Sequence, residues 1–81
     1  MRIGKIMFMF IVLEVDAHNM IVSREFNLSS ASAVDDFIEQ TNIPLKKELL
    51  NDVRFESHLF EQLEDNSTEE ISYMIIPVTI H

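Results

Sequence analysis

The chain has 81 residues, no cysteine, and a formal net charge of −8 from fourteen acidic and six basic side chains. The lack of cysteine excludes thiol nucleophiles, cysteine-ligated zinc and iron–sulfur clusters. The negative charge opposes binding to nucleic acid and to anionic membranes, and it favours a basic protein partner. Apolar residues make up 47% of the chain, too many for a disordered protein, so we expect one folded domain over residues 1–81.

The first predicted element is a β-strand from Lys5 to Val15 with apolar residues on both faces. The apolar run Ile6–Leu13 follows Arg2 and is similar to a secretory signal, but its eight residues are too few to span a bilayer as a helix. We therefore favour a buried strand over a signal peptide. So small a domain cannot cover both faces of this strand, which predicts a homodimer. The expected interface residues are Met7, Phe8, Met9 and Phe10.

The next stretch predicts a hairpin partner for that strand. Asp16–Asn19 has the composition of a tight turn, because Asp and Asn tolerate turn backbone angles. Met20–Leu28 alternates between two faces and is more polar than the first strand, which is typical of a strand with one face in water. We expect the two strands to pair antiparallel.

A helix is predicted after the hairpin. Ser29 or Ser30 is a suitable N-cap, and Thr41–Asn42 ends the helical pattern. Acidic residues stand in the early turns, where they complement the helix dipole. One buried stripe is expected from the spacing of Ala33, Val34, Phe37 and Ile38.

Two elements of less regular pattern follow. Pro44 suits the first turn of a second, short helix, expected from Leu45 to about Asp52. Val53–Leu63 has both an alternating pattern, typical of a strand, and a repeat of four with good helix formers. We favour the strand because the alternation is the better match.

The C-terminal third predicts a turn and a final strand. Glu64–Glu70 is a polar turn, and Ile71–Ile80 is rich in β-branched residues. Pro77 cannot donate to a ladder and marks an edge, a bulge or a strand end. The expected fold is α+β, a small antiparallel sheet in the order β-β-α-α-β-β with helices packed on one face.

No group of residues predicts catalysis or metal binding. Glu61 follows His58 by three residues, but one such pair supplies too few ligands for a metal site. The serines lack a nearby histidine, and the segment from Asp65 to Glu70 lacks the glycine of a calcium loop. We expect a protein that is not an enzyme and that has no cofactor and no metal.

The acidic residues are concentrated. Six acids and no Lys or Arg lie between Glu56 and Glu70. Clustered charge of one sign steers a partner of the opposite sign, so these residues are a candidate contact surface. The alternative is a solvated turn that is acidic for solubility. The candidate partner-binding residues are Glu61, Glu64, Asp65, Glu69 and Glu70, with Asp35, Asp36 and Glu39 as a second patch.

Two interpretations of function remain. The first is an inhibitor or adaptor whose acidic face binds a basic surface of a partner protein. By size and charge alone, the chain is similar to small acidic bacteriophage proteins that block host defence or nucleic-acid-handling enzymes, some as DNA mimics. The alternative is a homo-oligomeric structural or small-ligand-binding domain without catalytic activity. We expect a cytoplasmic location, in the host cytoplasm if the protein is viral, with no direct binding to nucleic acid or membrane.

Overall fold

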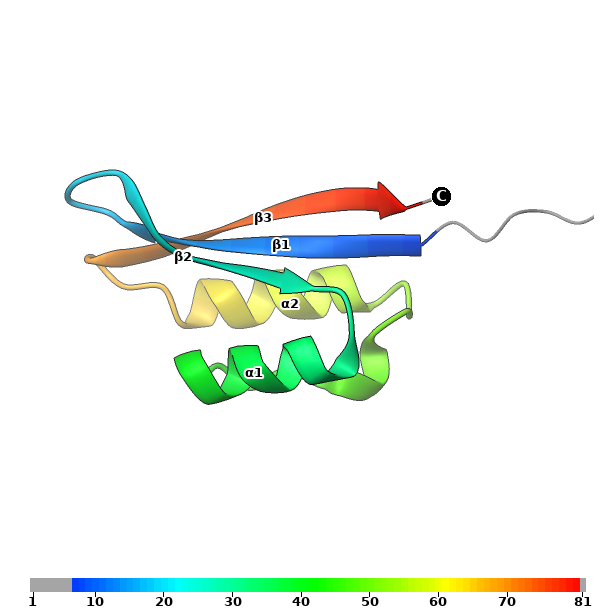
Figure 1. The fold of residues 1–81 in the computed structure, drawn as a ribbon. Coiled ribbons are helices and arrows are strands. Elements are labelled where there is room, and N and C mark those ends of the chain that lie inside the picture. Colours follow the sequence, from blue (N-terminus) through cyan, green and yellow to red (C-terminus); the bar gives the residue numbers. More distant parts are fainter. Residues whose placement is uncertain (1–6, 81) are drawn as a thin grey trace, which may run out of the picture.

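The computed structural model describes residues 7–80 as one antiparallel sheet with two helices on one of its faces (Figure 1). An α+β fold with helices on one side of the sheet is thus confirmed. The elements in chain order are β1 (Met7–Asp16), β2 (Ile21–Leu28), α1 (Ala31–Thr41), the 3-10 turn η1 (Lys47–Leu49), α2 (Phe55–Asp65) and β3 (Ile71–Ile80).

The sheet has three strands in the order β2-β1-β3, with β1 in the centre. The strand most apolar on both faces therefore has a neighbour on each side. The β1–β2 turn is closed by Asp16, whose Oδ1 accepts hydrogen bonds from the backbone N–H groups of His18 and Asn19 at 2.9 and 3.3 Å. Pro77 lies on β3, which is an edge strand, as its missing N–H predicts.

Helix α1 begins and ends where its capping residues predict. Ser30 is the N-cap, and its Oγ accepts a hydrogen bond from the N–H of Ala33 at 3.2 Å. Asn42 ends the helix in the left-handed region with φ 61°, a conformation that asparagine tolerates better than most residues. The helix buries Val34 and Phe37 against the sheet.

The strand prediction for Val53–Leu63 is wrong, because this segment forms α2. The order β-β-α-α-β-β is wrong with it, and the sheet has three strands instead of four. The repeat of four decides the outcome: Phe55, Leu59 and Leu63 are all buried on one helix face, and most of the residues between them are exposed.

The short helix expected from Leu45 to about Asp52 is reduced to the single turn η1. Two lysines at the start of this segment oppose the helix dipole, and no side chain caps its first turn. Asn51 adopts a left-handed conformation with φ 71° and stops the chain from continuing as a helix. Leu45 at the start of this segment is still part of the core, as is Ile43 just before it.

The core lies between the sheet and the helix layer. Helix α1 packs under β2 and helix α2 packs under β3 (Figure 1). Phe26 and Phe37 meet edge to face with ring centroids 4.8 Å apart, and Phe10 packs against Phe55 at 5.8 Å. Within residues 7–80, neither helix has the length or apolar content needed to cross a bilayer.

Candidate functional site

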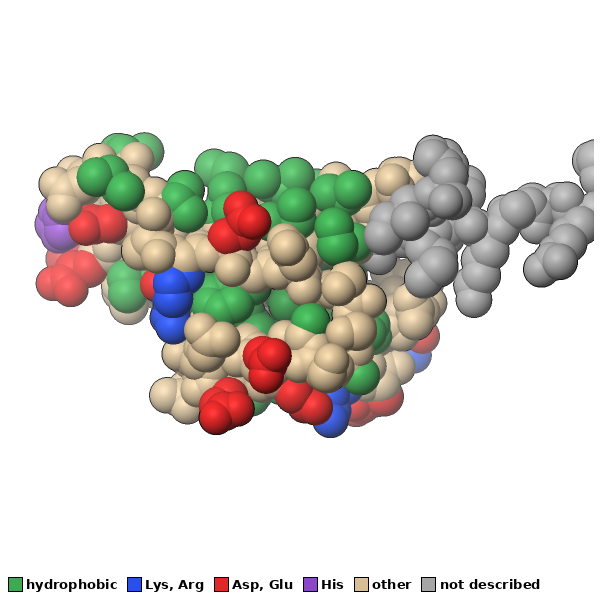
Figure 2. Space-filling model, in the orientation of Figure 1, with side chains coloured by type: hydrophobic (Ala, Val, Ile, Leu, Met, Phe, Trp, Pro, Cys, Tyr) green, Lys and Arg blue, Asp and Glu red, His purple; other side chains and the backbone are tan. Residues whose placement is uncertain are grey.

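The sheet has one face that no described element covers, which we name the open face. Side chains alternate along each strand, so Phe10 and Val12 point into the core and their neighbours Met9 and Ile11 point the opposite way. Hydrophobic side chains gather along this side of the strands, away from the helices (Figure 2). The apolar residues of the open face are Met9, Ile11, Leu13 and Val15 of β1, Val22 of β2, and Met74, Ile76 and Val78 of β3. Its polar residues include Glu25, Asn27 and Ser72, which are opposite Leu13, Ile11 and Val15.

Cross-strand pairing makes the β1 and β3 part of the open face a continuous apolar surface. In the β1–β3 register, Met9 is opposite Val78, Ile11 is opposite Ile76 and Leu13 is opposite Met74. Direct cross-strand neighbours on one face lie in contact distance. Met74 is 54% exposed and Ile76 37%, values far above those of core residues. A contiguous exposed patch of this kind typically marks a binding surface.

The structure divides the four residues expected at an oligomer interface. Met9 lies on the open face and is half-buried. Phe10 lies on the core side, 8% exposed, against Phe55. Met7 and Phe8 belong to β1, but their side chains lie outside those that the structure describes. The β3 residues of the open face were missed, although the apolar run of β3 on both strand faces was a signal for them.

The acidic residues lie mainly on the opposite side of the molecule. We name the exposed acids of the two helices the acidic layer, and several are visible along the lower surface in Figure 2. Glu69 and Glu70 lie apart from it, in the turn before β3, where the C=O of Glu70 accepts from the N–H of Ala17 at 2.9 Å. The expected patch is therefore divided between a helix surface and a turn. The acidic layer consists of Asp35, Asp36 and Glu39 of α1 and Glu56, Glu61, Glu64 and Asp65 of α2.

Few basic groups neutralise this layer. Within residues 7–80, the three ion pairs are Arg24–Glu14, Lys47–Asp35 and Arg54–Asp52. Hydrogen bonds from Arg54 lower the pKa of Asp52 to about 2. Among the acids of the acidic layer, only Asp35 belongs to an ion pair in this part of the chain, at 2.9 Å from Lys47. The layer therefore presents a net negative potential to a partner.

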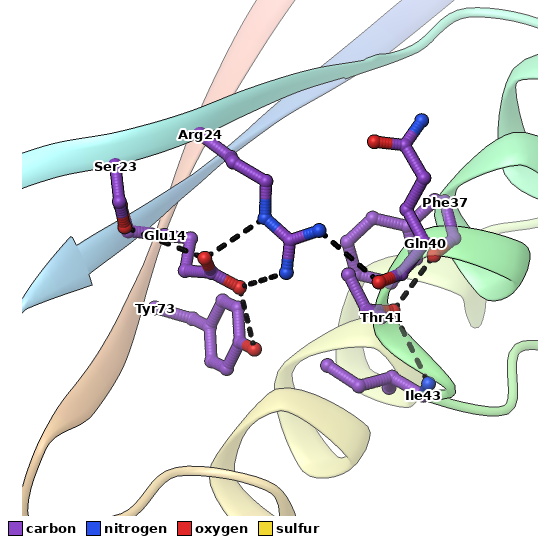
Figure 3. Close-up of polar contacts among 8 residues, drawn as sticks. All are labelled: Glu14, Ser23, Arg24, Phe37, Gln40, Thr41, Ile43 and Tyr73. Atoms are coloured by element: carbon purple, nitrogen blue, oxygen red, sulfur yellow. Dashed lines mark hydrogen bonds and ion pairs between the residues drawn. The ribbon is translucent and has the colours of Figure 1, made fainter.

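A polar cluster around the buried carboxylate of Glu14, which the sequence alone did not predict, joins all three strands (Figure 3). Glu14 is 5% exposed, and its Oε1 and Oε2 accept from Nε and Nη2 of Arg24 at 2.9 and 2.7 Å. Tyr73 donates to Oε2 at 3.1 Å and Ser23 to Oε1 at 3.3 Å. Arg24 Nη1 also donates to the C=O of Gln40 at 3.1 Å and so fixes β2 to α1.

The electrostatics of this cluster indicate a structural role. Hydrogen bonding to Arg24 lowers the pKa of Glu14, although burial of the carboxylate opposes this shift. Burial, followed by the hydrogen bond to Glu14, raises the pKa of Tyr73. Glu14 thus remains ionised with both oxygens satisfied, which stabilises the fold but leaves no proton poised for transfer near neutral pH. The sequence contained one signal for this cluster: the carboxylate of Glu14 lies at a position of β1 whose side chain points toward the core.

A groove of about 620 Å³ lies between α2 and β3. Its walls are mainly apolar, and Phe60, 60% exposed, stands on its helix side. The inward residues of β3 form its other side because α2 does not cover the edge of the sheet completely. Its lining includes Glu56, Phe60 and Glu64 of α2 and Tyr73, Ile75 and Pro77 of β3.

One histidine forms a hydrogen bond that stabilises the fold. Nε2 of His58 accepts a hydrogen bond from the N–H of Lys46 at 2.9 Å, which ties η1 to α2. No group of three or more potential metal-ligating side chains occurs in the described part of the chain.

Comparison of the chain with protein-family models, with curated protein sequences and with solved structures gives no match.

Proposed function

We propose that the protein is a non-catalytic interaction module that forms a homodimer through the open face and binds a basic surface of another protein through the acidic layer. One observation carries this proposal: the exposed apolar side chains of β1 and β3 gather on the open face, whereas most exposed acids lie on the helix side of the same sheet. Segregation of this kind supplies two surfaces with different binding chemistry.

The size of the open face supports a second copy of the chain as its occupant. Three strands of about ten residues present a flat area of roughly 34 by 14 Å, or about 480 Å². Side-chain relief raises the accessible area toward the roughly 600–1,000 Å² per partner that stable interfaces bury. Two copies that pack face to face would bury Ile11, Leu13 and Ile76 against their counterparts.

The charge distribution supports the same arrangement. The apolar residues of β1 and β3 meet on this face without a charged residue between them. Glu25 of β2 is opposite Leu13 on the same face, but it is exposed on an edge strand, so it can stay in water at the rim of a contact centred on β1 and β3. The acidic layers of a face-to-face dimer point away from each other, separated by two sheets. Repulsion between two chains of net charge −8 is thus kept small by distance and screening.

The acidic layer is the surface for a basic partner. Single exposed charges contribute little, roughly 0–1 kcal/mol each, but several acids on neighbouring turns steer a basic surface together. An inhibitor or adaptor of a basic, nucleic-acid-handling protein has this surface chemistry. The molecule then presents two acidic layers per dimer, which favours a partner that is itself repeated or symmetric.

The dimer is tested by light scattering at micromolar concentration. We expect the wild type to have twice the monomer mass and Ile76→Lys to have the monomer mass, with unchanged circular dichroism. Val53→Lys is the matched control because Val53 is 96% exposed and lies away from the open face. A wild type of monomer mass at high concentration would refute the dimer.

The partner surface is tested separately by association kinetics. The association rate of a basic protein that binds the immobilised wild type is measured at increasing salt concentrations. The same measurement is made on the triple variant Glu61→Lys, Glu64→Lys, Asp65→Lys. We expect slower association and a weaker salt dependence for the triple variant, since electrostatic steering acts mainly on the on-rate. Unchanged association and salt dependence would show that the acidic layer serves solubility alone.

A further inference from the structure

The groove beside β3 combines two features of a peptide-binding site. β3 pairs with β1 on one edge, and among residues 7–80 no strand pairs with its other edge. The unpaired N–H and C=O groups of an edge strand can bind an added strand. The groove between this edge and α2 offers a volume of about 620 Å³ for side chains of such a strand.

The helix side of the groove has a regular stripe of side chains. Glu56, Phe60 and Glu64 line it and are spaced four residues apart on α2, so they lie one above another on one helix face. All three are exposed. An aromatic ring flanked by two carboxylates selects an apolar group flanked by two cations.

The spacing of this stripe fits an extended chain. Four helical residues rise about 6.0 Å, and two residues of a strand rise about 6.6–6.8 Å. Three alternate residues of an added strand therefore match the three helix residues with a total mismatch of about 1.4 Å, which flexible side chains accommodate. Helix α2 runs alongside β3 in the opposite direction, because a short turn joins them (Figure 1).

We propose that this groove binds an extended segment of a partner protein, added as a strand to the free edge of β3, whose three groove-facing residues are basic, apolar and basic. The apolar residue packs on Phe60, and the two cations pair with Glu56 and Glu64. Neither carboxylate has an ion pair among the described residues. This site deepens the proposed partner binding and rests on that proposal, but it does not depend on the dimer.

The backbone register of the added strand follows from Pro77. This residue is opposite Phe10 in the β1–β3 ladder and has no N–H, so its nitrogen belongs on the free edge. By alternation, Tyr73 and Ile75 then direct their N–H and C=O groups to that edge as well. A ligand residue that pairs with Ile75 has its side chain on the groove side. The central apolar residue of the ligand thus forms backbone hydrogen bonds and contacts Phe60.

The probe is the capped peptide Thr-Lys-Thr-Ile-Thr-Lys-Thr, which reads identically in both directions and so fits either strand orientation. Its control, Thr-Thr-Lys-Ile-Lys-Thr-Thr, has the same composition with both lysines on the opposite strand face. In a titration followed by amide chemical shifts, we expect changes in residues 71–76 and 56–64. We expect the control peptide to bind at least fivefold more weakly.

Methylated peptides test the added strand directly. N-methylation of the central isoleucine removes an N–H directed at Ile75, and we expect binding to be lost. N-methylation of the following threonine alters an N–H that points away from β3, and we expect a change of less than twofold. Equal effects of the two methyl groups would overturn the strand-addition model.

Variants of the protein separate this site from general attraction to negative charge. We expect Phe60→Ser to weaken binding about tenfold and Glu64→Gln about threefold, as is typical of a central anchor and a rim charge. Glu48→Gln removes an exposed charge outside the groove and should leave binding unchanged. If both lysine peptides bind equally and Glu61→Gln weakens them as much as Glu64→Gln, the acidic layer binds basic peptides but the groove proposal is refuted. If neither peptide binds at millimolar concentration, the groove proposal is refuted. The association kinetics of the triple variant Glu61→Lys, Glu64→Lys, Asp65→Lys then test independently whether the acidic layer binds a basic partner.

Discussion

The two faces of the sheet are built from the same strands but end in opposite environments. On the helix side, Phe10 and Val12 are buried, and even the carboxylate of Glu14 has its hydrogen bonds satisfied. On the open face, Ile11 and Leu13 alternate with them and meet other apolar side chains across the ladder, without a covering layer in the described residues. Two short helices cover one face of the sheet, so the apolar content of β1 and β3 exceeds what one copy buries.

This difference distinguishes residues that stabilise the fold from residues that bind. Core residues are constrained by packing on every side, and their loss lowers the free energy of unfolding. Open-face residues have free space above them, so their loss should affect association more than folding. Substitutions on the two faces test that distinction.

Phe37→Ala should destabilise the fold most. Phe37 is fully buried on α1 and meets Phe26 edge to face at 4.8 Å, so truncation leaves a cavity and removes an aromatic contact. We expect the free energy of unfolding to fall by about 3–5 kcal/mol, enough to unfold much of a small domain. Urea unfolding followed by circular dichroism measures it. A loss no larger than that of Ile76→Ala would contradict the distinction between the two faces.

Arg24→Met should have an intermediate effect. The substitution removes two hydrogen bonds from a carboxylate that is 5% exposed and leaves Tyr73 and Ser23 as its donors. The side chain of Arg24 is 39% exposed, so solvent screening reduces the cost to about 1–2 kcal/mol. Arg54→Met breaks the exposed pair with Asp52 and is the matched control, with no measurable change expected in urea unfolding. Equal effects of both variants would show that the Glu14 cluster is not a buried structural element.

The same cluster predicts a dependence of stability on pH. The pKa of Glu14 is lower in the folded protein than its ordinary value of 4.5, so its ionised form stabilises the fold. That contribution is complete above pH 4.5 and is lost as the pH falls through the lowered pKa. We expect the unfolding free energy of Glu14→Gln to decline less steeply than that of wild type as the pH falls below 4.5. Parallel declines in both proteins would assign the acid sensitivity to other carboxylates.

Local signals in the sequence were sufficient for most of the fold. The β1–β2 hairpin, the cap at Ser30 and the edge position of Pro77 follow from turn, capping and proline chemistry. The segment Val53–Leu63 was assigned wrongly because its apolar residues Phe55, Leu59 and Leu63 fit both periods. Only their packing against the sheet selects the helix. Tertiary contacts decide between helix and strand in such a segment, and local sequence patterns do not reveal those contacts.

The candidate surfaces were predicted less completely than the fold. Apart from Glu56, the acids of the two helices were among the candidates chosen from charge alone, since exposed acids need no partner to be recognised. The open face required the β1–β3 register, which brings Ile11 beside Ile76 across 65 positions of sequence that local patterns do not connect. The Glu14–Arg24–Tyr73 cluster was missed for the same reason, because its members come from three strands.

The smallest effect on folding, and the sharpest test of the open face, is expected from Met74→Thr. Met74 is 54% exposed and lies opposite Leu13, so threonine keeps strand propensity while removing apolar area from the surface alone. In dilute solution we expect the unfolding free energy to change by less than about 0.5 kcal/mol. In a dimer, the midpoint of thermal unfolding rises with protein concentration because association stabilises the folded state. Calorimetry at several concentrations should show this rise for wild type and a smaller rise for Met74→Thr. If the wild-type midpoint is independent of concentration, the open face does not join two copies, and the apolar residues of β1 and β3 must serve a different partner.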